Sequence, residues 1–82
     1  MAWSDEPTDA QLAVVYRFIR WEMSTPEARE AAKWLGDNST RREVSFEIKR
    51  LRDLYNGRKL NRDLVFGSEI WDGCPIAPRK EK

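Results

Sequence analysis

Histidine is absent from this 82-residue sequence, and Cys74 is its only cysteine. Zinc sites in proteins are built mainly from cysteine and histidine, so we expect no metal site. The Ser-His and Cys-His pairs that activate a nucleophile are excluded on the same ground. The sequence also lacks a Gly-rich phosphate-binding loop. We therefore expect a protein without a cofactor that works by binding and not by catalysis.

One pair of carboxylates deserves separate consideration as a general acid and base. Glu43 and Glu47 lie one helical turn apart in a segment with helical spacing, and arginines flank them. Such a pair needs burial and a cleft before its pKa values suit proton transfer. The sequence indicates neither, so we expect no catalytic residues here.

Long apolar runs are missing as well. The longest, Leu12 to Tyr16, is far shorter than the roughly 20 residues that span a bilayer. A single cysteine permits no internal disulfide, whereas small domains from oxidising compartments usually contain several. Residues 1–9 are acidic and lack the basic-then-apolar order of a secretion signal. We expect a cytoplasmic protein that does not bind a membrane.

Charge is abundant but unevenly distributed. Charged residues make up 35% of the sequence, against about 25% in an average globular protein. The net charge is only +1, and residues 1–37 contain four Arg and Lys against seven Asp and Glu, a local charge of −3. Residues 38–62 contain eight Arg and Lys against three Asp and Glu, a local charge of +5. The near-neutral total therefore conceals a basic middle segment.

Apolar spacing and capping signals predict a first helix over residues 9–23 and a second that begins at Thr25. Thr8 and Gln11 form a capping box before the first helix. Thr25, which precedes a proline, is expected to cap the second helix, and Gly36 is expected to end it.

A polar turn, residues 37–39, separates these helices from a third, predicted over residues 40–55. Thr40 and Glu43 form a second capping box at its start, and residues 56–57 (Asn-Gly) are expected to close it. Its expected core face comprises Val44, Ile48, Leu51, Leu54 and Tyr55.

Together these signals predict a compact all-α bundle of three helices in a single domain, residues 1–73. Ile70 and Trp71 are expected to return to the core as a short C-terminal element that closes over the first helix. Residues 74–82, with two prolines and a charged end, are expected to form a flexible tail.

One broad face of the third predicted helix is basic. Its cations lie about one turn apart, so their side chains stack along one side, where they can neutralise phosphates. Phe46 lies beside them, where an exposed ring can stack on a base or contact a thymine methyl. Arg58 and Lys59 would extend this surface as an arm. The predicted nucleic-acid-binding residues are Arg41, Arg42, Ser45, Phe46, Lys49, Arg52, Arg58 and Lys59.

The alternative interpretation of the same residues is a solvated helix face. Glu43, Glu47 and Asp53 are close enough in the sequence to pair with Lys49 and Arg50. Charge runs on helices commonly have no role beyond solvation.

Residues 28–54 loosely resemble a helix-turn-helix. Ala32 and Gly36, four residues apart, precede a polar turn and a helix with periodic apolar residues. In that family an alanine packs where the helices cross and a glycine lies in the turn. Residues 36–40 depart from the pattern because they exceed the usual turn length, and Asp37 stands where an apolar residue is common. The resemblance implies that the third helix is the recognition helix, with its first turns nearest the bases.

A second apolar stripe, on the first predicted helix, is a rival binding surface. Val14, Phe18 and Trp21 lie on a different face from the expected core residues of that helix. An exposed stripe of this kind is typical of a dimer seam or of a pocket for a protein partner. Alternatively, the C-terminal segment around Trp71 folds back and covers it.

Two hypotheses of function follow. In the first, the protein binds nucleic acid, DNA rather than RNA, through the basic face of the third helix, and acts as a regulator. In the second, it is a protein-binding module, an adaptor or an inhibitor of a larger complex. That module would use the apolar stripe, or would present the basic face to an acidic protein surface. A homodimer is compatible with either hypothesis.

Overall fold

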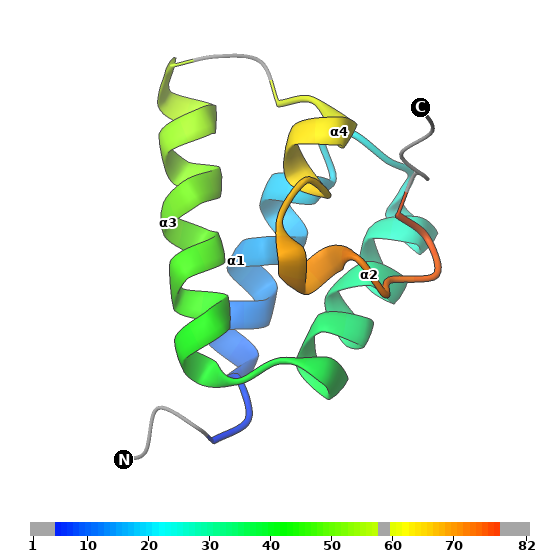
Figure 1. Ribbon diagram of the computed structural model, residues 1–82. Helices are drawn as coiled ribbons and strands as arrows, with labels where there is room; N and C mark the ends of the chain where they lie inside the picture. Colours follow the sequence, from blue (N-terminus) through cyan, green and yellow to red (C-terminus); the bar gives the residue numbers. More distant parts are fainter. Residues whose placement is uncertain (1–4, 58–59, 78–82) are drawn as a thin grey trace.

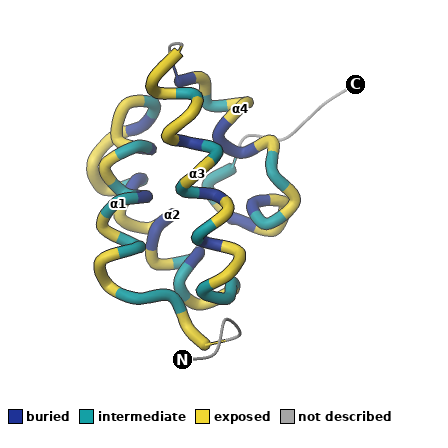
Figure 2. The backbone as a smooth tube through the Cα atoms, turned by 90° about the vertical axis from the view of Figure 1, so that its left-hand side faces the viewer, coloured by how far each residue is buried: buried dark blue, intermediate teal, exposed yellow. Residues whose placement is uncertain are grey.

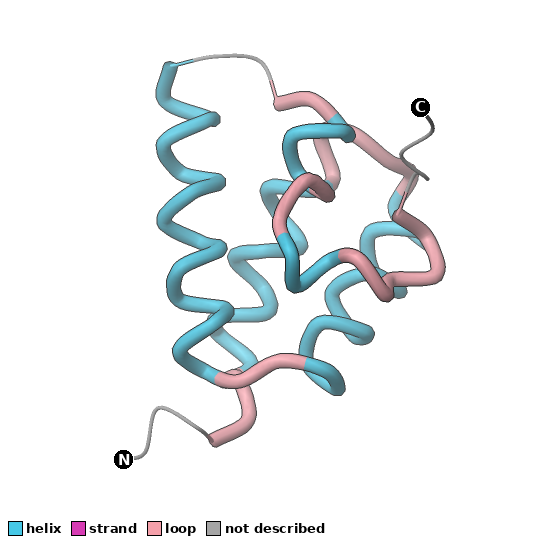
Figure 3. Tube along the Cα trace, viewed as in Figure 1, coloured by secondary structure: helices cyan, strands magenta, loops and turns pink. Residues whose placement is uncertain are grey.

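The computed structural model describes residues 5–57 and 60–77, which form helices joined by short turns (Figure 1). This described part of the chain contains four α-helices, one 3-10 helix and no strand (Figure 3). The elements are α1 (Asp9–Ile19), α2 (Thr25–Asn38), α3 (Arg41–Gly57), α4 (Arg62–Val65) and η1 (Glu69–Trp71). The predicted small all-α fold is therefore confirmed.

The helix α3 has neighbours on two opposite flanks. Figure 1 shows α1 behind α3, and α4 with the chain that follows it in front. After the quarter turn of Figure 2, α1 and α4 stand on opposite sides of α3. The helix α1 packs against both α2 and α3. This arrangement leaves one outer face where α1 and α3 run side by side.

The core lies between these helices and the C-terminal segment. Trp71 is fully buried, meets the ring of Phe66 edge-on at 4.7 Å between centroids, and stacks on Trp34 at 6.2 Å. Two large aromatic residues that follow α4 thus complete a core that three short helices alone would leave open. The buried cluster includes Val15, Ile19, Ala28, Ala31, Leu35, Val44, Leu51, Val65, Phe66 and Trp71.

The two predicted capping boxes are present. Thr8 Oγ1 accepts a hydrogen bond from the backbone N–H of Gln11 at 3.1 Å, and the Gln11 side chain accepts one from the Thr8 N–H at 3.0 Å. Thr40 and Glu43 are joined in the same reciprocal way at the start of α3. These local bonds satisfy backbone donors that helix geometry leaves unpaired.

The cap of α2 lies one residue earlier than predicted, at Ser24 and not at Thr25. Ser24 and Glu27 form a third capping box, which the sequence-based interpretation missed. The backbone N–H of Ser24 donates to the Glu27 carboxylate and is the main reason that the pKa of Glu27 is lowered. Arg62 of α4 donates to the same carboxylate at 3.3 Å, which ties α4 to the start of α2.

The helix α1 is shorter than the apolar spacing predicts, because it ends at Ile19 and not at Met23. The N–H groups of Trp21 and Glu22 bond to carbonyls three residues earlier, which tightens the chain and turns it toward the extended cap residue Ser24. Met23 is still buried, because this turn points it inward. The sequence pattern correctly marked it as a core residue but placed it in the wrong element.

The helix α2 is longer than predicted and contains Gly36 instead of ending there. It continues to Asn38, so only Ser39 and Thr40 connect it to α3. A Cβ atom at position 36 would lie 2.8 Å from Leu12 Cδ1 of α1. Gly36 therefore permits close approach of α1 to α2 and is not the helix terminator that the sequence indicated.

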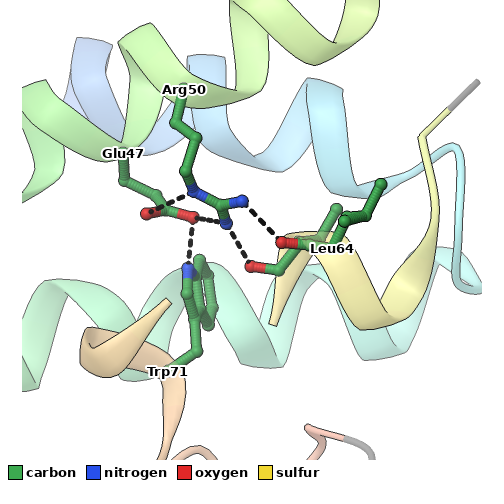
Figure 4. A network of polar contacts seen from close by, with 5 residues as sticks. Glu47, Arg50, Leu64 and Trp71 are labelled. Carbon is green, nitrogen blue, oxygen red and sulfur yellow. Dashed lines mark hydrogen bonds and ion pairs between the residues drawn. The ribbon is translucent and has the colours of Figure 1, made fainter. Parts of the chain in front are cut away.

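An ion pair within α3, between Glu47 and Arg50, is hydrogen-bonded to the C-terminal segment (Figure 4). Glu47 is only 3% exposed, and its Oε2 accepts hydrogen bonds from Arg50 at 2.6 Å and from the indole Nε1 of Trp71 at 2.7 Å. Arg50 also donates to the backbone carbonyls of Leu64 and Val65, at 2.6 and 2.7 Å, at the end of α4. The carboxylate and the guanidinium thus satisfy polar groups from three elements.

The compact part of the chain extends beyond the boundary expected at residue 73. Cys74 is 6% exposed, and Ile76 and Ala77 pack against the core. Residues 74–77, which the sequence assigned to the tail, thus pack on the core, and residues 78–82 lie outside the described part of the chain. Burial raises the pKa of the Cys74 thiol, so this group remains protonated at neutral pH.

Candidate nucleic-acid interface

The exposed side of α3 carries a shallow hollow of about 490 Å³. Three cations and one aromatic ring border it, and no carboxylate does. Five of the eight residues predicted to bind nucleic acid therefore come together on one surface. The lining residues are Arg42, Ser45, Phe46, Ile48, Lys49 and Arg52.

Arg42 and Phe46 form a stacked pair at one end of this hollow. The guanidinium carbon of Arg42 lies 5.7 Å from the ring centroid of Phe46, within cation-π distance. Phe46 is 61% exposed although it is a large apolar residue. The arginine covers part of one ring face and leaves the ring available to a second planar group.

Two of the acidic residues of α3 have partners away from this surface. In the described structure Glu47 pairs with Arg50, on the flank of α3 that faces α4, and Glu43 is engaged in the capping box with Thr40. The ion pairs found there include neither Lys49 nor Arg52. Of the pairings that the solvated-face interpretation assumed, Glu47 with Arg50 is therefore present, and none with Lys49 is found among the described residues.

The remaining predicted contacts are not in this hollow. Arg41 is half-buried at the start of α3, where its N–H donates to the carbonyl of Asp5 at 2.7 Å. The carbonyl of Arg41 accepts from the Gln11 side chain at 3.3 Å. These bonds hold the start of α3 against α1, so Arg41 is a poor candidate for base recognition. Arg58 and Lys59 lie outside the described residues.

The apolar stripe of α1 borders a second hollow of about 580 Å³, between α1 and α3. Phe18 and Trp21 contact the ring of Tyr55, with centroids 5.8 and 5.6 Å apart. The C-terminal segment does not cover the stripe as expected, because Trp71 packs on Trp34 and on the opposite flank of α3. Trp21 remains 65% exposed. The lining residues are Val14, Arg17, Phe18, Arg20, Trp21, Arg52 and Tyr55.

The two hollows share Arg52 and are therefore adjacent, and we call them together the α1–α3 face. It unites the two surfaces that the sequence presented as rivals. Every charged residue that lines either hollow is an arginine or a lysine. A face with cations and exposed rings, but without lining carboxylates, is suited to an anionic partner that has planar apolar groups.

Tyr55, Arg17 and Arg20 were absent from the predicted site. Tyr55 follows the core spacing of α3, but it is 49% exposed and lies against Phe18 and Trp21 at the border of the second hollow. The early end of α1 depends on the turn at residues 20–23, which the apolar periodicity did not reveal. The helical spacing did place Arg17 and Arg20 on a separate strip of α1. That strip was the one feature of the sequence that could have marked them as binding residues.

The structure also bears on the acid–base pair considered from the sequence. Glu47 is buried, contrary to expectation, but its carboxylate is occupied by Arg50 and Trp71. Glu43 is exposed, so the two carboxylates do not share a cleft. The described residues contain no cluster of three side chains able to hold a metal ion. In the same part of the chain, no helix has the length and apolar character needed to cross a membrane.

Comparison with known proteins gives no family for this chain. No protein-family model, no curated protein and no solved structure matches it.

Proposed function

We propose that this chain is a small, non-catalytic, cytoplasmic nucleic-acid-binding protein, with a regulatory role, that uses the α1–α3 face. One observation carries the proposal: Arg42, Lys49 and Arg52 line one hollow together with Ser45 and the exposed ring of Phe46, and no carboxylate lines it. Arginine and lysine bind phosphates by charge, and a hydroxyl adds a hydrogen bond.

The order of the elements lends further support. The helices α2 and α3 are joined by only two residues, Ser39 and Thr40, as in the short connection of a helix-turn-helix. The cations lie along the exposed side of α3 and not only at its first residues, where that family places its base contacts. On this basis α3 is the main binding helix, and it contacts the nucleic acid along its side because its first turn is held against α1.

The proposal is tested by fluorescence anisotropy of a labelled mixed-sequence DNA, titrated with the protein at low and at physiological salt. The double reversal Lys49→Glu/Arg52→Glu removes two phosphate-binding groups and adds two repulsive ones. We expect it to weaken binding roughly tenfold or more, and we expect wild-type binding to fall steeply as salt rises.

The matched control is Arg29→Glu/Lys33→Glu on α2. Both residues are exposed and line neither hollow, and the change in net charge equals that of the first variant. The control is expected to bind nearly as well as wild type. No binding by wild type at low salt, or equal loss in the two variants, would contradict the proposal.

The second candidate is a protein-binding module that uses Val14, Phe18 and Trp21. The 65% exposure of Trp21 favours it, because exposed tryptophans are common in protein interfaces. Arg17, Arg20 and Arg52 border the same hollow, so a protein partner would need an acidic surface. Poly-glutamate added to the DNA titration distinguishes nucleic-acid binding from binding to an acidic protein. If poly-glutamate displaces the DNA when its carboxylates are about as concentrated as the DNA phosphates, an acidic protein partner is favoured.

A further inference from the structure

Exposed aromatic residues are concentrated on the α1–α3 face. Among the described residues, four large apolar side chains are exposed: Trp21 at 65%, Phe46 at 61%, Tyr55 at 49% and Leu64 at 45%. The three aromatic residues all line one of the two hollows, whereas Leu64 lies on α4. Phosphate binding alone requires no such rings, so their position calls for a ligand with an apolar surface.

The rings alternate with cations along the face. Phe46 lies beside Arg42 at one end, and Trp21 lies against Tyr55 at the other, with a tilt of 47° between their planes. Arg52 borders both hollows and therefore lies between the two aromatic groups. Phe46 and Tyr55 are about 14 Å apart along the axis of α3, since each residue of an α-helix adds about 1.5 Å, and the half turn between them makes them project from different sides of the helix, so a strand that reaches both passes around α3. That separation is long enough for a short run of nucleotides.

We infer that the preferred ligand of the α1–α3 face is single-stranded nucleic acid, with unpaired bases stacked on Trp21 and Phe46. This inference rests on the proposed function and specifies its ligand. In a duplex the faces of each base are covered by its neighbours, so a protein ring has no base face to stack on. In a single strand those faces are open, and rings beside phosphate-binding cations are the usual means of holding them.

The start of α3 supports a single strand over a duplex. A helix that reads the major groove places its first residues against the base edges. Here the first residue of α3, Arg41, is half-buried, and its backbone is bonded to Asp5 and to Gln11. The exposed surface instead runs along the side of α3 and across to α1. A lateral surface of this kind follows a flexible strand better than it enters a groove.

The test compares labelled probes by fluorescence anisotropy at one salt concentration. The probes are a mixed-sequence DNA strand of about 12 nucleotides, its RNA equivalent, its blunt duplex, and an abasic strand that retains the phosphates. Wild type is expected to bind the DNA or the RNA single strand roughly tenfold or more tightly than the duplex and the abasic strand, because each stacked base adds affinity.

Trp21→Ala is expected to lower single-strand affinity part of the way to the abasic level, because the stack on Phe46 remains, while duplex affinity stays unchanged. Trp21→Phe retains a ring and is expected to restore most of the binding. Leu64→Ala is the matched control, because it removes a similarly exposed apolar side chain outside the face. Thermal melting by circular dichroism checks that each variant is folded.

Equal affinity for single strand and duplex, with Trp21→Ala without effect, would overturn this inference and leave the proposed function intact. Failure of every probe to bind at low salt would overturn both. Binding of the abasic strand as tightly as the full strand would show that phosphates alone are recognised and would also overturn the inference.

Discussion

Glu47 is the one buried charged residue among those described, and it shows what a single side chain contributes to this fold. Its carboxylate accepts from Arg50 and from Trp71, two residues that belong to different elements. Arg50 in turn donates to the carbonyls at the end of α4. The C-terminal segment is thus attached to α3 by polar bonds as well as by apolar packing.

Replacement of Glu47 by alanine is expected to lower the free energy of unfolding by about 2–3 kcal/mol, because the indole N–H and the guanidinium would lose their acceptor. Chemical denaturation followed by circular dichroism measures this change. Asp53→Ala, an exposed change on the same helix, is expected to stay within about 0.5 kcal/mol. A Glu47→Ala variant as stable as Asp53→Ala would show that the network contributes little.

The role of Glu47 could not have been predicted from the sequence. The spacing of α3 puts position 47 beside the core face, where a glutamate is ordinarily exposed. Its partner Trp71 lies 24 residues further along, in a segment without clear periodicity. The pairing of Glu47 with Arg50, one helical turn away, was expected from the spacing and is present, but the bonds of both residues to the C-terminal segment were not. The network depends on tertiary contacts, which local spacing does not encode.

At the scale of elements, local signals predicted the helices more reliably than their ends. The capping boxes at Thr8 and Thr40 were identified because their partners lie three residues away and the bonds are local. The predicted ends of α1 and α2 were wrong: a tight turn after Ile19 ends α1 early, and α2 continues through Gly36 to Asn38. The position of Gly36 in the sequence suggested a C-cap, whereas it lies inside α2, where the lack of a side chain leaves room for Leu12 of α1.

The substitution Gly36→Val tests this explanation of the α1–α2 contact. Added side-chain atoms would clash with Leu12 and are expected to cost about 1–3 kcal/mol of unfolding free energy, the usual penalty for an overfilled core. Gly57→Val is the matched control at the end of α3, where a Cβ would meet nothing within 4 Å. Thermal or denaturant unfolding of both variants gives the comparison. Similar stabilities would mean that α1 and α2 have room to separate.

At the scale of the whole molecule, size restricts where a ligand can bind. The Cα radius of gyration is 11.9 Å, close to the value of about 12 Å expected for a compact chain of this length. The two hollows described above are surface features bordered by exposed side chains. Binding on the outer face of α1 and α3 is therefore the arrangement that this fold favours.

Much of the candidate site was predictable because it lies on one regular helix. The period of α3 alone placed Arg42, Ser45, Phe46, Lys49 and Arg52 on one side. The sequence could not show that the stripe of α1 joins this side, because that depends on how α1 and α3 pack. The sequence also predicted that the C-terminal segment closes over α1, whereas its Trp71 packs on Trp34 and bonds to Glu47 of α3. A short apolar segment does not indicate which surface it will cover.

The location of nucleic acid on the α1–α3 face is tested most directly by amide and indole chemical-shift mapping. Labelled protein is titrated with a short DNA strand, and the N–H signals that move are assigned. The Trp21 indole is the key reporter, because Trp21 is 65% exposed on the face while Trp71 is fully buried and bonded to Glu47. We expect large shifts for Trp21 and for the exposed side of α3, and little change for Trp71 or for α2. Shifts confined to α2 or α4, with the Trp21 signal unmoved, would contradict the proposed site.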